Sequence, residues 1–205
     1  VHAVIHHFNT PHIAYNGAAR FYMDASPMDM PRTEYIFDST VKYVGDRVAA
    51  VAADTPAIAT AAIKLIEVEY ELLPHAVELE SAVRESSPQA NPNGKDGSNL
   101  CGDWLAYGND SEEAVLEEIK KADFSFQDTF RTPRVHHGYM EPVCHIANYT
   151  REGKLTVWSS CQNVFCFRDV ISTALELPQN KVRVIKTVSG GAFGGKLEVM
   201  HEPVV

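Results

Sequence analysis

A glycine-rich segment near the C-terminal end constrains the fold of this chain more than any other feature. Four of the six residues from 190 to 195 are glycine, within the run Ser-Gly-Gly-Ala-Phe-Gly-Gly-Lys at 189–196. Because glycine has no side chain and accepts positive φ, such a loop can approach a ligand closely and turn its N–H groups toward an anion or an oxo group. Residues 181–188 are rich in β-branched side chains, which predicts a strand that leads into the loop.

The loop is close to the phosphate-binding loop of nucleotide hydrolases. Gly190, Gly195 and Lys196 satisfy the pattern GxxxxGK. The next residue is Leu197, however, where that pattern requires Ser or Thr to bind Mg²⁺. The sequence therefore disfavours nucleotide binding, and a plain glycine turn between two packed elements stays open as an alternative.

Length and charge narrow the classes of function. A chain of 205 residues allows one large domain or two modest ones. The net charge of −9 disfavours a nucleic-acid partner, because there is no basic excess to bind phosphates. We find no signal peptide and no apolar run of membrane-spanning length, so the cytosol is the default compartment. The start at Val1 and the stop at Val205, just after the glycine segment, suggest a fragment of a longer protein.

The cysteines form no CxxC pair, and we expect free thiols at all of them, namely Cys101, Cys144, Cys161 and Cys166. A zinc site can be drawn from His136, His137, Cys144 and His145. Their spacing lacks the short ligand pairs of structural zinc sites, so this alternative is disfavoured, and we expect no metal ligand from this chain.

The N-terminal part reads as strand, helix and strand. Residues 44–53 are apolar enough for a buried strand. Thr55 then offers an N-cap oxygen and Pro56 suits a first helical turn, which predicts a helix over 57–66. Residues 66–71 alternate strictly between apolar side chains and glutamates, as a half-buried strand does.

The middle of the chain indicates a domain boundary. Residues 86–110 are rich in Asn, Gly, Ser and Pro, which is typical of a mobile linker. Residues 111–121 have acidic side chains at the start and basic ones at the end, which predicts a helix that matches its dipole. A further strand is expected at 122–131.

The C-terminal part reads as a β-α-β unit, with strands at 154–160 and 182–188 and a helix at 165–177. Gln162 follows the first strand, and the glycine loop follows the second. Because ligand sites in α/β sheets favour the carboxyl ends of strands, we expect Gln162 and the loop to meet.

Motifs in both halves resemble one family. The runs at 43–50 (Tyr-Val-Gly-Asp-Arg-Val-Ala-Ala), 66–71 (Ile-Glu-Val-Glu-Tyr-Glu) and 73–74 (Leu-Pro) resemble the hammerhead domain of the molybdenum hydroxylases, which include xanthine dehydrogenase and aldehyde oxidase. Five further runs resemble the start of the molybdopterin-binding domain of this family and follow in the same order. They lie at 138–142 (Gly-Tyr-Met-Glu-Pro), 157–162 (Val-Trp-Ser-Ser-Cys-Gln), 177–178, 181–184 and 190–196.

The resemblance implies an α+β fold in three parts. A hammerhead-like α/β domain would occupy 1–85, a linker 86–110, and the first part of a molybdopterin-binding α+β domain 111–205.

The resemblance also implies an enzyme. The family hydroxylates an electron-poor carbon, of an N-heterocycle or an aldehyde, with water-derived oxygen at a molybdenum–pyranopterin (molybdopterin) centre. It implies a small-molecule substrate, iron–sulfur clusters and FAD on other subunits or segments, and neither a nucleic-acid nor a membrane partner; a homodimer is compatible with it. Most pterin contacts and the general base of the family lie beyond Val205, so we expect the fragment alone to bind no cofactor and to be inactive.

Five residues carry the implied site. Gln162 stands where the family's glutamine hydrogen-bonds a terminal molybdenum oxygen, although a cap on the following helix stays open as its alternative role. Phe193 and Gly194 match the loop beside the metal, with Phe193 excluding water and the Gly194 N–H as a preorganised donor. Gly191 and Ala192 would contact the cofactor; a methyl group at 192, where glycine is frequent, is tolerable if φ is negative.

Position 197 bears on the substrate. Leu197 replaces a glutamate that holds the purine in xanthine-oxidising relatives, and Glu198 comes one residue later. Leucine cannot make that hydrogen bond, so a purine substrate is in doubt. From the residues alone, a non-catalytic α/β scaffold or partner-binding domain stays open as the second interpretation.

Overall fold

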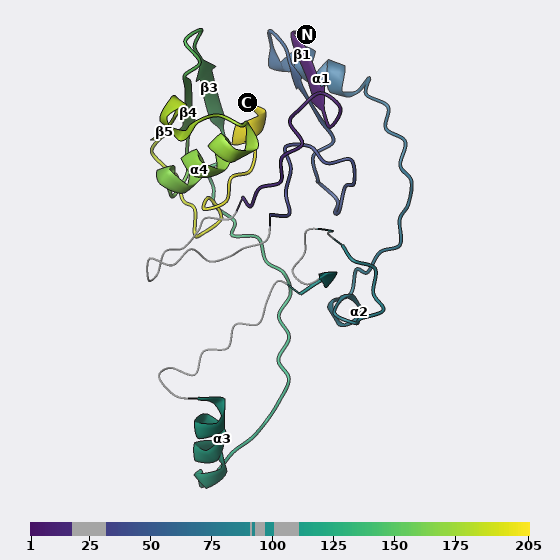
Figure 1. Ribbon diagram of the computed structural model, residues 1–205, viewed down its shortest axis with the longest axis vertical. Coiled ribbons are helices and arrows are strands. Elements are labelled where there is room, and N and C mark those ends of the chain that lie inside the picture. The colour runs from purple at the N-terminus through teal and green to yellow at the C-terminus, as the bar shows by residue number, and fades with distance from the viewer. Residues whose placement is uncertain (18–31, 91, 93–96, 101–110) are drawn as a thin grey trace. The chain divides into compact units, whose positions relative to one another are not determined.

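The computed structural model describes residues 1–17, 32–90, 92, 97–100 and 111–205. The chain divides into two compact units, one formed by residues 1–101 with 137–205 and the other by residues 102–136. Figure 1 shows helices and strands in both the N-terminal and the C-terminal part, so the predicted α+β class is confirmed. The predicted linker at 86–110 lies partly outside the described residues.

The N-terminal part contains a two-stranded antiparallel sheet and a helix. Strand β1 (Ala3–His6) pairs with β2 (Ala49–Ala52), and α1 (Pro56–Ile63) follows. The side-chain oxygen of Thr55 accepts a hydrogen bond from the N–H of Ile58 at 3.3 Å, which confirms the predicted cap. Strand β2 is shorter than the predicted 44–53, because its partner β1 offers four residues and Val44 lies exposed in a turn.

The predicted strand at 66–71 is wrong. These residues have no regular secondary structure and pair with no strand in the part of the chain that the structure describes, and Tyr70 remains 64% exposed. Alternation describes which faces side chains would take, but a strand also needs a hydrogen-bonding neighbour. A short helix, α2 (Leu79–Ala82), comes next.

The C-terminal part is built on a three-stranded sheet of order β3-β4-β5. Strand β3 (His145–Tyr149) is antiparallel to β4 (Leu155–Ser159), and β4 is parallel to β5 (Val182–Lys186). Helix α4 (Val164–Ala174) connects the parallel pair, so the predicted β-α-β unit is confirmed. The helix ends before the predicted residue 177, because Glu176 adopts a positive φ of 54°. Strand β3 was not predicted.

The core joins the sheet, the helix and a segment from the N-terminal part. Val157 of β4 packs in one buried cluster with Phe167 and Ile171 of α4, and Tyr15 and Phe37 belong to the same cluster. Apolar burial of this kind contributes about 25 cal/mol per Å². Two 3₁₀ turns, η2 (Gln179–Lys181) and η3 (Glu202–Val204), flank β5 and the C-terminal end.

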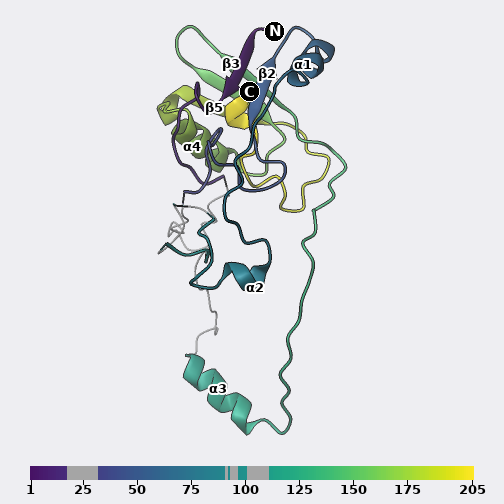
Figure 2. The ribbon, with the colours of Figure 1, turned by 90° about the vertical axis from the view of Figure 1, so that its right-hand side faces the viewer.

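The second unit contains α3 (Glu112–Lys121), seen also in Figure 2. The side-chain oxygen of Ser111 accepts from the N–H of Ala114 at 3.3 Å, and acidic and basic residues occupy the first and last turns, as predicted. The predicted strand at 122–131 is wrong: these residues pair with no described strand, and Phe126 is 76% exposed. Across the described residues, no helix has the length and apolarity needed to cross a membrane.

Candidate functional site

The glycine loop follows β5 and winds through consecutive tight turns. Gly191 and Gly194 have φ values of 96° and 90°, which favour glycine. The N–H of Gly195 donates to the carbonyl of Ala192 at 2.8 Å. Ala192 lies outside the set of residues with positive φ, so the condition for its methyl group is met. Phe193, in contrast, has a φ of 53° and a side chain that is 75% exposed, a strained and open arrangement typical of functional loops.

Four consecutive backbone N–H groups in the middle of this loop, those of residues 191–194, have no acceptor among the described residues. Backbone N–H groups are strong donors that need a partner in protein or solvent. The loop can therefore offer several N–H groups to a bound group that carries oxygen atoms.

Two of the glycines are required by close packing. A Cβ atom on Gly190 would lie 2.9 Å from Cβ of Glu141. A Cβ atom on Gly195 would lie 2.7 Å from Cε1 of Tyr139 and 3.0 Å from Nδ1 of His137. The segment around 137–141 thus packs directly against the loop.

A single carboxylate joins both ends of the loop. Oε2 of Glu141 accepts a hydrogen bond from the N–H of Gly190 at 2.7 Å and from Nζ of Lys196 at 2.5 Å. The Lys196 ammonium and the Gly190 N–H hold the pKa of Glu141 below its usual range. Lys196 is 2% exposed, and its Nζ lies 4.9 Å from the centre of the Tyr139 ring. The sequence interpretation gave no role to Glu141 or to Lys196; their only signal was membership of two motifs 55 residues apart.

Gln162 meets the loop at its far end, as predicted. The N–H of Gln162 donates to the Lys196 carbonyl at 3.0 Å, and Oε1 of Gln162 accepts from the Lys196 N–H at 3.2 Å. Helix α4 is capped instead by Asn163, whose side-chain oxygen accepts from the N–H of Cys166 at 3.2 Å. The alternative role of Gln162 as a helix cap is therefore wrong, and its amide nitrogen has no partner among the described residues.

A buried polar cluster of His145, Ser159 and Glu202 contacts the chain that follows the loop, and the sequence did not predict it. Oγ of Ser159 donates to Oε1 of Glu202 at 2.9 Å and lies 3.1 Å from Nδ1 of His145. Oε2 of Glu202 accepts from the N–H of Met200 at 2.9 Å. Burial lowers the pKa of His145, against the opposing effect of Glu202. This cluster supports the chain that leaves the loop.

The zinc alternative gains no support. Among the described residues, no group of three or more His, Cys, Asp or Glu side chains could hold a metal ion. Cys144 and Cys161 carry free thiols, as expected, whereas Cys101 lies outside the described residues.

Comparison with known families decides the identity. Residues 96–205 match the family described as molybdopterin cofactor-binding domain, and residues 1–74 match the aldehyde oxidase and xanthine dehydrogenase a/b hammerhead domain. The chain belongs to the xanthine dehydrogenase and aldehyde oxidase family of molybdenum hydroxylases. The predicted family and its molybdenum-binding subunit are thereby confirmed.

Individual relatives agree with this assignment. The chain is 36% identical over 171 residues to the nicotinate dehydrogenase large molybdopterin subunit of Eubacterium barkeri, covering 80% of this chain and 37% of that protein. It is 32% identical over 203 residues to a probable xanthine dehydrogenase subunit of Bacillus subtilis, covering 99% of this chain and 25% of that protein. The chain thus spans only a minor part of the length of these relatives.

A solved structure shares the fold. The aldehyde oxidoreductase from Desulfovibrio gigas aligns with a TM-score of 0.77 and 23% identity, covering 100% of this chain and 22% of that one. At this identity the likeness speaks for the fold alone. It agrees with the α+β class and with the hammerhead domain.

Proposed function

We propose that residues 190–196 and Gln162 form one wall of a molybdopterin site in an enzyme that hydroxylates an electron-poor carbon. The observation that carries this proposal is the set of unused N–H groups at 191–194, in a loop that is bonded to Gln162 at Lys196 and that follows the parallel strands β4 and β5 at their carboxyl ends. Ligands of α/β sheets bind at such ends.

The donors present fit an oxygen-bearing cofactor. Backbone N–H groups and a neutral amide donate hydrogen bonds without adding charge, which suits oxygen atoms on a metal. Bound molybdopterin would supply the two-electron redox chemistry. Gln162 and the Gly194 N–H would each donate to its oxygens, Gly191 and Ala192 would line it, and the exposed ring of Phe193 would shield the reacting face from water.

The same geometry speaks against a nucleotide. A phosphate-binding loop directs its lysine at the terminal phosphates. Here Nζ of Lys196 is buried and bound to Glu141 at 2.5 Å, so it is not available to a phosphate.

The substrate class follows from position 197. Leu197 is half-buried directly after the loop and its side chain offers no hydrogen bond, whereas Glu198 is exposed one residue further on. We infer an aldehyde or a non-purine N-heterocycle as substrate. Several further expectations stay predictions. They are the iron–sulfur and flavin partners, a homodimer, the domain division at 1–85, 86–110 and 111–205, the cytosolic location, and the inactivity of the isolated fragment.

The test replaces the amide of Gln162 in the complete protein that carries this chain. Gln162→Ala should lower the molybdenum content per protein and change the Mo(V) electron paramagnetic resonance signal. The matched control is Gln179→Ala, which removes an exposed glutamine that bonds Asp169 at 2.6 Å away from the loop. Equal metal content and identical spectra for the two variants would contradict the proposed site.

A further inference from the structure

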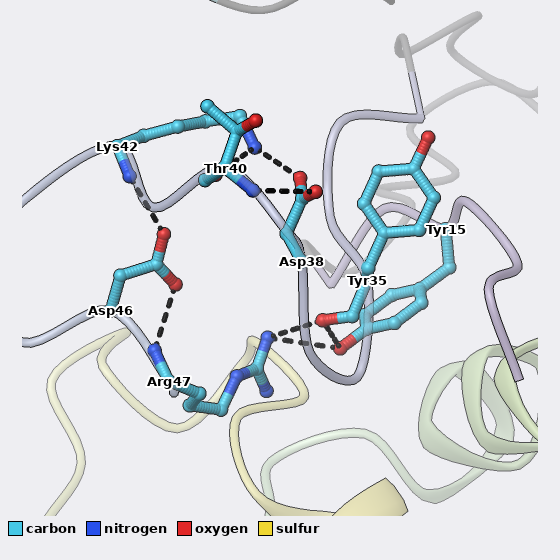
Figure 3. Close-up of polar contacts among 7 residues, drawn as sticks. All are labelled: Tyr15, Tyr35, Asp38, Thr40, Lys42, Asp46 and Arg47. Atoms are coloured by element: carbon cyan, nitrogen blue, oxygen red, sulfur yellow. Dashed lines mark hydrogen bonds and ion pairs between the residues drawn. The ribbon is translucent and has the colours of Figure 1, made fainter. Parts of the chain in front are cut away.

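Arg47 connects the N-terminal part of the larger unit to the chain that leaves the glycine loop. Its Nη2 donates to the hydroxyl of Tyr15 at 3.1 Å and to the carbonyl of Tyr35 at 2.9 Å. Its Nη1 donates to the carbonyl of Met200, four residues beyond Lys196. Figure 3 shows the guanidinium group turned toward the oxygens of Tyr15 and Tyr35. One planar group therefore joins three acceptors from three segments.

A second bond links the same parts of the chain. The N–H of Val199 donates to the carbonyl of Gly17 at 2.8 Å, and Val199 is 2% exposed. The fit is close, because a Cβ atom on Gly17 would lie 2.8 Å from the Val199 carbonyl oxygen and 2.8 Å from Oε2 of Glu34. Residues 199–200 are thus held by neighbouring bonds to Gly17 and Arg47.

The Tyr15 hydroxyl, one of the acceptors of Arg47, has a single protonation state at neutral pH. Tyr15 is 1% exposed, and burial raises its pKa to about 12, so its hydroxyl stays protonated and neutral. That hydroxyl donates to the Tyr35 carbonyl at 3.2 Å while it accepts from Arg47. Arg47 therefore meets a rigid pair of oxygens at neutral pH.

We propose that Arg47 is a positioning residue that sets the place of the glycine loop through residues 199–200. The loop is tied at Lys196 to Glu141 and Gln162, and the next anchored residues are Val199 and Met200. Loss of Arg47 removes the bond to the Met200 carbonyl and weakens the far side of this short tether, which the bonds of Val199 to Gly17 and of Met200 to Glu202 still hold. The ligand of the loop rests on the proposed function; the control of loop position by Arg47 does not.

Hydrogen exchange of the complete protein, followed by mass spectrometry, tests the inference. Arg47→Met keeps the apolar stem and removes all three hydrogen bonds. Exchange of the amides in residues 190–200 that donate hydrogen bonds, those of Gly190, 195–197, Val199 and Met200, should become roughly tenfold faster, the order expected for loss of hydrogen bonds from a charged donor. Exchange in the β3–β4 hairpin, residues 145–159, should stay unchanged.

Asp38→Asn is the matched control. It breaks the ion pair between Oδ2 of Asp38 and Nζ of Lys42, which lie 2.5 Å apart. This pair belongs to the polar network drawn in Figure 3 but makes no bond to residues 199–200. Arg47→Lys keeps the charge but lacks the planar fork, so it should restore only part of the protection. Tyr15→Phe, which removes one acceptor, should give a smaller increase in the same segment.

The outcomes separate the two proposals. Faster exchange confined to 190–200 in Arg47→Met supports positioning, whereas unchanged exchange there, or an equal increase at 145–159, overturns it. If Arg47→Met does not fold, Arg47→Lys and Tyr15→Phe decide, and wild-type exchange in both overturns the inference. If the proposed function fails, the complete protein will contain no molybdenum. The exchange rates of Arg47→Met and the wild type can still be compared in that case, because they do not depend on a bound cofactor.

Discussion

The ammonium group of Lys196 lies 2.5 Å from Oε2 of Glu141, and that same oxygen accepts the N–H of Gly190. The side chain of Lys196 is only 1% exposed, whereas that of Glu141 is 34% exposed. One partly exposed carboxylate thus closes a seven-residue loop and neutralises a buried cation. A buried ammonium group needs such a partner, because its charge is expensive to remove from water.

Removal of the carboxylate charge should open the loop at Lys196. Glu141→Gln leaves the buried ammonium unpaired, so the side chain should move to solvent and make the Lys196–Leu197 peptide bond accessible to trypsin. We expect faster cleavage at this bond in brief digests of the folded protein, measured by mass spectrometry. Glu118→Gln, at an exposed pair with Lys121, should leave the cleavage rate unchanged. Wild-type resistance in Glu141→Gln would mean that Lys196 is held by other contacts.

Acid should weaken the same closure. The pKa of Glu141 is lower in the folded protein than in the unfolded chain, so the unfolded chain binds the proton more readily. The stabilisation is complete above the unfolded-state pKa and is lost as pH falls through the folded-state value. Amide exchange at Gly190, corrected for its intrinsic pH dependence, should therefore rise in acid. Because Asp38 and Glu152 also have lowered pKa values, the diagnostic quantity is the difference from Glu141→Gln, which should vanish at low pH.

Local chemistry was predictable from the sequence, and long-range pairing was not. The cap at Thr55 and the charge pattern of α3 act within one helical turn, so short windows contain the whole signal. The strand predicted at 66–71 failed because its ladder partner is not encoded in those residues. Strand β3 was not predicted because its sequence, His-Ile-Ala-Asn-Tyr, contains only one β-branched residue.

The site shows the same division. Gln162 and the loop were expected to meet because both follow parallel strands, and that topological rule holds here. The partnership of Glu141 with Lys196 depends instead on how the segment before β3 packs on the loop. Arg47 and Met200 are 153 residues apart, and nothing in the spacing of either motif points to their bond.

The buried histidine below the loop should give a separate pH dependence. Burial lowers the pKa of His145 from its usual value of 6.5, so the unfolded chain takes up a proton first as pH falls. Its contribution to stability is present above pH 6.5 and is lost as pH falls toward the folded-state value. The midpoint of thermal unfolding should drop less in acid for His145→Gln than for the wild type. His75→Gln, at an exposed histidine bonded to the Leu73 carbonyl, should behave as the wild type; identical profiles for both variants would contradict the assignment.

A methyl group at Gly195 should displace the loop without any change of charge. The added Cβ would lie 2.7 Å from Tyr139 and 3.0 Å from His137, so either the aromatic ring or the loop backbone must shift. Overpacking of this kind costs about 1–3 kcal/mol. The opening free energy of the loop, measured by hydrogen exchange, should fall by that amount in Gly195→Ala, together with molybdenum content. Gly45→Ala serves as the comparison, because φ there is +100° but no atom lies within 4 Å of the added Cβ. That variant should show local strain at its own turn and wild-type exchange at 190–196, whereas a similar effect of both substitutions on the loop would show that close packing against Tyr139 and His137 does not set its position.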